Sequence, residues 1–191
     1  RILEDGTWIF QTPADENGNV GRTDLPDLSQ RQVLGNAQPL FTFGWNNTFR
    51  YKNWDATIFF RGVFGNKILN VTRWAYGPDA KSQSLNVFLK DVTGDKVVYT
   101  NKTYFSDYYL EDGSYLKLDN LTIGYNFKFK ENKYIDKLRV YFTGQNLLTI
   151  TKYSGQDPEV NTTGVWDAGI DYPSFYPTVA TFMFGINLTL F

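Results

Sequence analysis

The sequence predicts an all-β fold: about five strands of a transmembrane antiparallel β-barrel that is larger than this chain. Five long segments alternate apolar and polar residues, which is the period of a strand with two different faces. Aromatic residues make up 18% of the chain, and they favour both strands and membrane interfaces. Long and short connections alternate between the segments, as in bacterial barrels, whose periplasmic turns are short and whose extracellular loops are long.

Composition argues against most other kinds of protein. With 19 basic and 20 acidic residues and no cluster of Lys or Arg, the chain offers no positive surface for nucleic acid. It contains no Cys and no His, so it lacks thiol nucleophiles, disulfides, the usual zinc ligands and the usual general base, and we do not expect an enzyme. No apolar run is long enough for a transmembrane helix. Barrel strands are not excluded, because alternation lowers their mean hydropathy.

The first two expected strands, residues 40–51 and 53–64, place aromatic and aliphatic side chains on one face. The opposite face carries polar residues such as Thr48 and Asp55, and a minimal turn around Lys52 separates the two strands. The apolar residues are Phe41, Phe43, Trp45, Phe49 and Tyr51 in the first strand, and Trp54, Ala56, Ile58, Phe60 and Phe64 in the second.

The third and fourth expected strands are residues 114–129 and 137–148. Polar residues such as Asn126 and Arg139 occupy one face of each strand. Aromatic residues recur at the strand ends, as the girdles at the two membrane interfaces require. The apolar residues are Leu121, Ile123, Tyr125, Phe127 and Phe129 in the third strand, and Leu138, Val140 and Phe142 in the fourth.

The fifth expected strand, residues 178–191, shows the alternation most clearly. Its even positions are apolar from Ala180 to Leu190, whereas its odd positions include Thr181, Gly185 and Asn187. A globular strand has about 5 or 6 residues, and a tilted membrane strand has about 9 to 11. Length and alternation together therefore favour a membrane strand.

The connections predict an orientation, because the C-terminus of a bacterial barrel normally lies on the periplasmic side. Residues 1–39, 65–113 and 149–177 would then be extracellular loops, with a strand end near residues 7–11, and residues 130–136 would be a periplasmic turn. Five strands cannot close a barrel, and an open edge would leave backbone groups unpaired in lipid. We therefore expect the remaining strands and an export signal upstream of Arg1.

The candidate metal ligands are Asp15, Asn17 and Asn19, which provide oxygen donors at alternating positions. An EF-hand loop needs Gly at its sixth position and Glu at its twelfth, and the corresponding residues here are Val20 and Pro26. A solvated, Asx-rich turn is therefore favoured over a metal site. No cofactor is expected, and a structural calcium ion in the extracellular loops stays an open alternative.

Two further groups of loop residues are candidates for function. The carboxylates of Asp157, Glu159, Asp167 and Asp171 are the material for an acid/base pair, but such residues in loops are more often solvated turn formers. The loop aromatics are candidates for stacking on sugars or for anchoring a partner protein, and the alternative is that they pack the loops or lie at the headgroup interface. These aromatics are Trp74, Tyr76, Trp166, Tyr172, Phe175 and Tyr176.

A series of motifs from about residue 31 to the end resembles the SusC/RagA class of TonB-dependent outer-membrane transporters of Bacteroidetes. Any one motif is weak, but five in the family's order are specific. They are VLGNAQP at residues 33–39 leading into FGWNNTFRYK at 43–52, SDYYLEDGSYLKL at 106–118, LRVYFTGQNL at 138–147, DPEV at 157–160 and FGINLT at 184–189.

The resemblance implies a 22-stranded barrel with an N-terminal plug and a TonB box, both expected upstream, through which the TonB complex would act. It implies import of oligosaccharides or peptides across the outer membrane, with a SusD-like lipoprotein as an extracellular lid over loops that include the aromatics named above. The tail departs from the family, because Leu190 and not the terminal Phe191 keeps the lipid-facing register. The barrel-assembly signal would comprise Phe182, Phe184, Ile186, Leu188, Leu190 and Phe191.

Two alternatives remain at this point. The first is a soluble or surface-exposed β-sandwich that binds glycans without transporting them, although a sandwich has shorter strands and no systematic alternation of loop length. The second is a passive porin or an adhesin barrel, which shares the same wall and differs only in lacking an upstream plug.

Overall fold

The computed structural model describes residues 8–25, 27, 31–77, 106–129, 134–160, 167–174 and 176–190. The chain divides into two compact units. The first comprises residues 1–36, 69–111 and 170–175, and the second comprises residues 37–68, 112–169 and 176–191. Among the described residues, no helix has the length and apolar character needed to cross a membrane.

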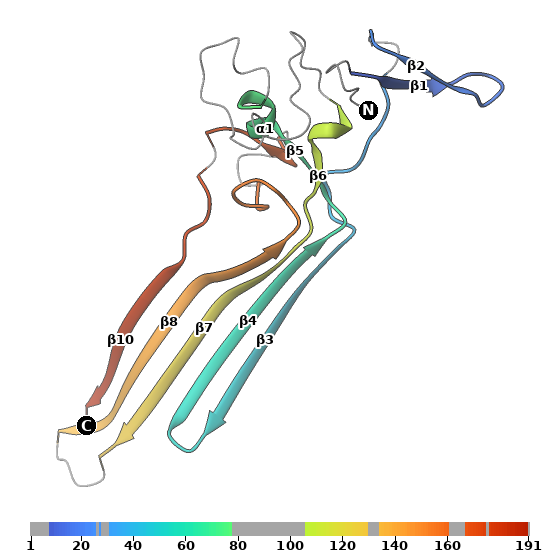
Figure 1. Ribbon diagram of the computed structural model, residues 1–191. Helices are drawn as coiled ribbons and strands as arrows, with labels where there is room; N and C mark the ends of the chain where they lie inside the picture. The colour runs from blue at the N-terminus through green and yellow to red at the C-terminus, as the bar shows by residue number, and fades with distance from the viewer. Residues whose placement is uncertain are drawn as a thin grey trace. The chain divides into compact units, whose positions relative to one another are not determined.

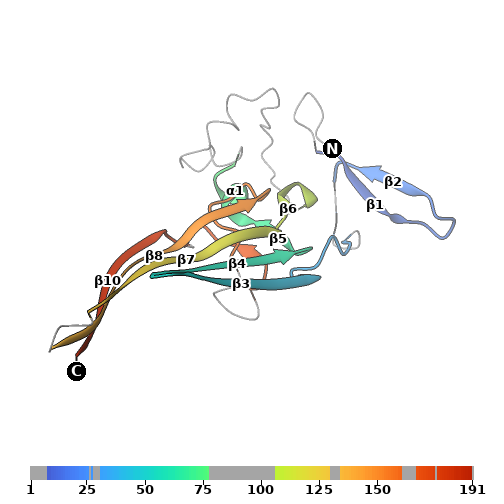
Figure 2. The same cartoon turned by 90° about the horizontal axis from the view of Figure 1, so that it is seen from below.

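The second unit contains one five-stranded sheet, whose strands lie in the order β10-β8-β7-β4-β3 (Figure 1). All neighbouring strands are antiparallel, and they twist and curve along their length (Figure 2). The sheet confirms the predicted fold class. The strands are β3 (Phe41–Tyr51), β4 (Trp54–Phe64), β7 (Tyr115–Lys128), β8 (Ile135–Thr151) and β10 (Thr181–Leu190).

The register of the strands places the predicted apolar residues on one face. Directly opposed residues of an antiparallel pair share a face, and one row of opposed residues crosses the whole sheet: Phe49, Ala56, Ile123, Phe142 and Phe184. The phenylalanines of this row are 44–70% exposed. In a β-sandwich a second sheet would cover such a face, so the described residues do not have the geometry of that alternative.

The height of the apolar face matches a membrane. The 11 residues of β3 extend about 33 Å along the strand, and a tilt of about 40° reduces this to about 25 Å along the barrel axis. The outward apolar band of an outer-membrane barrel is about 25 Å tall. The face is therefore tall enough to cross the hydrocarbon core of an outer membrane.

Aromatic clusters mark both ends of this face. At the turn end, the rings of Trp54 and Tyr125 have centroids 4.9 Å apart, and the Lys52 ammonium lies 5.4 Å from the Tyr51 ring centroid. Such side chains suit the headgroup level, where one end of the ring is apolar and the other is wet. At the opposite end, the rings of Phe41, Phe43 and Phe64 stack with centroids 5.7–6.1 Å apart.

A β-bulge in β7 is the main feature of the sheet that alternation did not predict. Phe59 and Phe60 of β4 are adjacent, but they pair with Asn120 and Leu118, so that Asp119 is an extra residue. The bulge reverses the alternation along the rest of β7. As a result Leu116 and Leu118 lie on the apolar face, and Tyr115 and Lys117 lie on the polar face with Arg61, the register partner of Lys117.

Short elements occupy parts of the predicted extracellular loops. A hairpin joins β1 (Phe10–Ala14) and β2 (Val20–Thr23), and a small sheet has the order β6-β5-β9, with β5 and β9 parallel. A core of Trp8 and Tyr109 forms within the first unit, with Leu69 and Trp74 packed against it. The remaining elements are β5 (Lys67–Asn70), α1 (Val71–Ala75), η3 (Asp107–Tyr109), β6 (Leu110–Asp112) and β9 (Ile170–Asp171).

Candidate functional site

A polar network joins three strands near the turn end of the polar face. Arg139 of β8 pairs with Asp55 of β4 through two contacts, of 2.5 Å from Nη2 to Oδ2 and 3.1 Å from Nε to Oδ1. The Asn126 amide of β7 donates to Asp55 Oδ1 at 2.6 Å. Gly124 makes room for the pair, because a Cβ there would lie 2.7 Å from Arg139 Nη2. Bidentate geometry makes this a strong type of ion pair.

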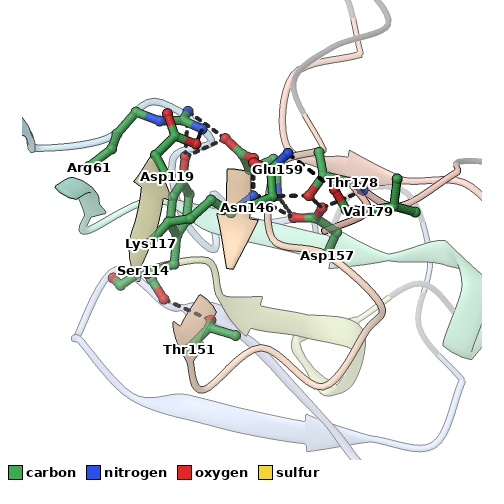
Figure 3. A network of polar contacts seen from close by, with 11 residues as sticks. Arg61, Ser114, Lys117, Asp119, Asn146, Thr151, Asp157, Glu159, Thr178 and Val179 are labelled. Atoms are coloured by element: carbon green, nitrogen blue, oxygen red, sulfur yellow. Dashed lines mark hydrogen bonds and ion pairs between the residues drawn. The ribbon is translucent and has the colours of Figure 1, made fainter. Parts of the chain in front are cut away.

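A second and larger network lies near the other end of the polar face, where it joins the sheet to the segment that follows β8 (Figure 3). We call residues 152–160 the strap, because they lie against the polar face where β4 ends and β7 begins. We call the network of side chains that holds them the clamp. The clamp consists of Arg61, Tyr115, Lys117, Asp119, Asp157, Glu159 and Thr178.

Glu159 is the strap residue that contacts the strands most extensively. Its carboxylate accepts hydrogen bonds from the Lys117 ammonium, from Arg61 Nη1 at 2.5 Å and from the Tyr115 hydroxyl at 3.0 Å. Arg61 also reaches Asp119, the bulge residue, at 3.2 Å. The bulge therefore places Lys117 and Tyr115 on the face where Arg61 of β4 already lies and which Glu159 approaches.

Asp157 anchors the strap to the segment that enters β10. Its carboxylate accepts from the backbone N–H of Thr178 at 2.9 Å and from the Thr178 hydroxyl, and it caps the strap's own turn by accepting from the N–H of Glu159 at 3.0 Å. The Thr178 hydroxyl oxygen in turn accepts from the Lys117 ammonium at 3.0 Å. Lys117 thus links β7, the strap and the entry to β10.

Burial makes these charges interdependent. The Lys117 side chain is fully buried, and Asp157 is 5% exposed. Burial raises the pKa of the Glu159 carboxyl, but the hydrogen bonds and charges of Lys117 and Arg61 outweigh it and hold the pKa below its ordinary value. Burial likewise raises the pKa of Asp157, and the bonds from Thr178 and the Glu159 N–H, with the charge of Lys117, lower it further than that. Both carboxyls are therefore ionised near neutral pH.

The lowered pKa values predict that acid releases the strap. A carboxyl with a lower pKa in the clamped state binds fewer protons there than in the released state, so the stabilisation is fully present above about pH 5 and is lost as the pH falls below about 4. A nitroxide spin label on Gln156→Cys should be immobile at pH 7 and should become progressively more mobile as the pH is lowered below about 4. Glu159→Gln leaves the buried Lys117 ammonium without its nearest carboxylate, so its label should already be more mobile at pH 7 and should respond less to acid. Equal immobility of the parent label across this pH range would contradict the prediction.

The candidate aromatics that the structure describes differ in their surroundings. Trp74 packs on the core of Trp8 and Tyr109, and Tyr76 is half-buried. Tyr172 is 39% exposed and Tyr176 is 79% exposed. Trp166 and Phe175 lie outside the described residues. Contact of any of these residues with a substrate or lid stays a prediction.

The terminal residues proposed as an assembly signal form a row on the exposed apolar face of β10. The described members of this row, from Phe182 to Leu190, are 52–70% exposed, whereas Phe191 lies outside the described residues. Their exposure suits contact with lipid, but their role in assembly stays a prediction.

The acidic candidates have other partners. Asp157 and Glu159 belong to the clamp, so neither is available as a free catalytic acid or base. Asp15 accepts hydrogen bonds from the backbone N–H of Asn19 at 2.8 Å and of Asn17 at 2.9 Å; these bonds lower its pKa and form the expected Asx-rich turn. Among the described residues there is no group of three or more acidic, His or Cys side chains placed to hold a metal ion. A structural calcium ion stays a prediction.

Sequence reasoning missed most of the clamp. Lys117 is a single cation among apolar strand residues, and a charged residue in such a segment is a signal of a buried partner. The sequence does point to the motif that contains Asp157 and Glu159, but it predicts solvated carboxylates, whereas the structure pairs both in the clamp. Arg61 and Asp119 gave no signal in the sequence, because the contact between them depends on the bulge.

An exposed apolar band about 25 Å tall on one face and a polar, ion-paired opposite face define the wall of an outer-membrane β-barrel. No family model matches the chain. It is 36% identical over 187 residues to TonB-dependent receptor P3 of Formosa agariphila, with 91% of this chain covered. It is 30% identical over 201 residues to TonB-dependent receptor SusC of Bacteroides thetaiotaomicron, with 97% of this chain covered. The chain spans 18% of the length of each of these relatives.

Solved structures give the same result for the fold. The RagAB peptide importer in the closed-closed state matches with a TM-score of 0.81 at 24% identity, over 98% of this chain and 22% of that one. A second structure, of the RagAB peptide transporter, matches with a TM-score of 0.80 at 25% identity and the same coverage. The chain belongs to the SusC/RagA family of TonB-dependent receptors and forms part of their larger barrel.

Proposed function

We propose that the protein containing this chain imports oligosaccharides or peptides across the outer membrane in a TonB-dependent reaction, and that this chain supplies barrel wall and extracellular loops. The observation that carries the proposal is similarity over nearly the whole chain to SusC and to a peptide transporter, combined with a sheet that has one exposed apolar face and one polar face. One relative is named a peptide transporter, and the names of the receptors give no cargo. Both classes of cargo therefore remain candidates.

The proposal includes a fixed orientation in the membrane. The C-terminus and the turn around Lys52 lie on the periplasmic side, and residues 1–39, 65–113 and 149–177 form extracellular loops. The aromatic girdles at both ends of the apolar face support a transmembrane placement, and the alternation of long and short connections supports the direction.

Labelling of single cysteines in the full-length protein tests this orientation. Asn17→Cys, at the tip of the β1–β2 hairpin, should react with a bulky, membrane-impermeant maleimide on intact cells. Lys52→Cys, in the β3–β4 turn, should react only after the outer membrane is permeabilised. The reverse pattern would show that the orientation is wrong.

The partners are part of the proposal. A SusD-like lipoprotein would cover the extracellular loops, and the TonB complex would act through an upstream segment. Affinity purification of the full-length protein from outer membranes in detergent should recover a lipoprotein of this kind in stoichiometric amount. Recovery of the barrel protein without a lipoprotein would contradict the proposal that a SusD-like lipoprotein covers the loops.

Uptake measurements test the function itself. A strain lacking the protein should lose uptake of either a fluorescent peptide mixture or a fluorescent oligosaccharide mixture, and the full-length protein should restore it. A protonophore should abolish the restored uptake, since TonB is energised by the proton gradient of the inner membrane. Uptake that survives the protonophore would point to a passive porin, and unchanged uptake of both mixtures in the deletion strain would reject import.

A further inference from the structure

The strap lies on the face that would line the interior of the barrel. Arg61 and Lys117 are register partners on the polar face, and both contact Glu159 of the strap. In a membrane barrel the polar face is turned away from lipid. At the level of Lys117, the strap and not the strands therefore forms the inner surface of this part of the wall.

The strap is packed like a core segment and unlike a free loop. Tyr153 is 6% exposed and Val160 is 1% exposed, and both belong to one apolar cluster with Ile68. Its entry is held as well, since the Thr151 hydroxyl donates to the carbonyl of Ser114 at 2.8 Å and accepts from the N–H of Tyr153 at 3.1 Å. The strap is thus held at its start, along its length and, through Asp157, at the entry to β10.

Lys117 is the residue on which this arrangement depends. Its ammonium is fully buried, and it contacts Glu159, Thr178 and, at 3.9 Å, Asp157. Removing one partner from a buried ion pair leaves an uncompensated charge, which is far more destabilising than replacing both partners. Without Lys117, Glu159 keeps Arg61 and Tyr115, and Asp157 keeps Thr178. Part of the buried negative charge nevertheless loses its counter-ion and is better solvated if the strap moves out to water.

We propose that the strap is a fixed inner layer of the import path, held in place by Lys117 as a positioning residue. This inference rests on the proposed import function. The strap buries the charge of Lys117 and pairs with that of Arg61, which stays 36% exposed, and it presents its own exposed residues, such as Gln156, beside the strand side chains. Cargo therefore passes an immobile surface here, whose exposed residues are Lys152, Ser154 and Gln156.

Spin-label spectroscopy tests the clamp. The label is placed at Gln156→Cys in the full-length protein in outer-membrane vesicles. This chain contains no cysteine, and any cysteine elsewhere in the full-length protein is replaced. We expect an immobile label in the parent, a mobile label in Lys117→Met, and an immobile label in Lys137→Met, which removes an exposed lysine paired with Asp136 at 3.5 Å. Heat-modifiable electrophoresis confirms that each barrel is folded.

A double variant distinguishes the clamp from general damage. In Lys117→Met with Glu159→Gln, the glutamine oxygen still accepts from Arg61 and Tyr115, and the clamp loses one negative charge along with the positive one, so its net charge is that of the parent. This variant should again give an immobile label. A mobile label in the parent, or an immobile label in Lys117→Met, would overturn the clamp.

Uptake kinetics of the mixture that the parent imports test the role of the strap in the path. Lys117→Met should raise the half-saturation concentration several-fold at an unchanged amount of folded barrel, and the double variant should restore it. A mobile strap with unchanged kinetics would overturn the strap as part of the path. An immobile strap in a parent that imports neither mixture would support the clamp and overturn the import function.

Discussion

Replacing Trp45 with arginine should destabilise the folded barrel by about 2–4 kcal/mol, the cost of an arginine at the membrane midplane on the lipid face of a barrel. Trp45 lies near the middle of β3 and is 57% exposed on the apolar face. Its ring stacks on Phe60 of β4 with centroids 5.7 Å apart. The variant therefore loses this stacking and also places a cation in lipid, and both effects have the same sign.

The neighbouring residue is a matched control for this prediction. Asn46 lies next to Trp45 at nearly the same depth, but on the polar face, where it pairs with Phe59. Asn46→Arg adds the same charge to the aqueous interior and should have little effect on stability. The measurement is the temperature at which heat-modifiable electrophoresis shows half of the full-length barrel unfolded. Equal losses in Trp45→Arg and Asn46→Arg would mean that this face does not contact lipid.

The fold was predictable because strand alternation is a local property. Apolar residues occupy every second position of β10 from Phe182 to Leu190. Such alternation predicts the face of each residue without information about the partner strand. The bulge at Asp119 was not predictable in the same way. It is defined by a register shift against β4, so it exists only once two strands are paired.

The clamp was harder to predict for a related reason. Lys117 and Glu159 are 42 residues apart in the chain, and a carboxylate in a loop is usually solvated. Burial of Glu159 depends on Arg61 of β4 and on Lys117, which the bulge turns to the same face. The prediction from the sequence therefore named the right acidic residues of the strap, but it was wrong in placing their carboxylates in solvent.

In β10, Gly185 lies beneath the ring of Tyr141 from the neighbouring strand β8. Gly185 of β10 and Tyr141 of β8 are register partners on the polar face. A Cβ at Gly185 would lie 2.6 Å from Tyr141 Cε1 and closer still to two other atoms of that side chain. The Arg139 guanidinium lies 4.8 Å from the centroid of the same ring and also pairs with Asp55 of β4. Tyr141 thus links β10 to the network that joins β4, β7 and β8.

Gly185→Ala should therefore cost about 1–3 kcal/mol of barrel stability, the usual cost of overpacking, because the Tyr141 ring must leave its place and can carry Arg139 with it. Gly44→Ala is the matched control. It adds the same methyl group to the same face, but its nearest contact is 3.2 Å, to the end of the Phe59 ring. Both variants reduce the entropy of the unfolded chain equally, so the difference between them reports the clash.

A double-mutant cycle identifies Tyr141 as the cause. If the ring is what the methyl group displaces, Gly185→Ala should cost much less in a Tyr141→Ala background than in the parent, since contacting residues show coupling energies of about 0.5–3 kcal/mol. Additive effects of the two substitutions, or equal losses in Gly185→Ala and Gly44→Ala, would show that the ring does not hold the last strand. The coupling would then have to come from backbone pairing between β8 and β10 alone.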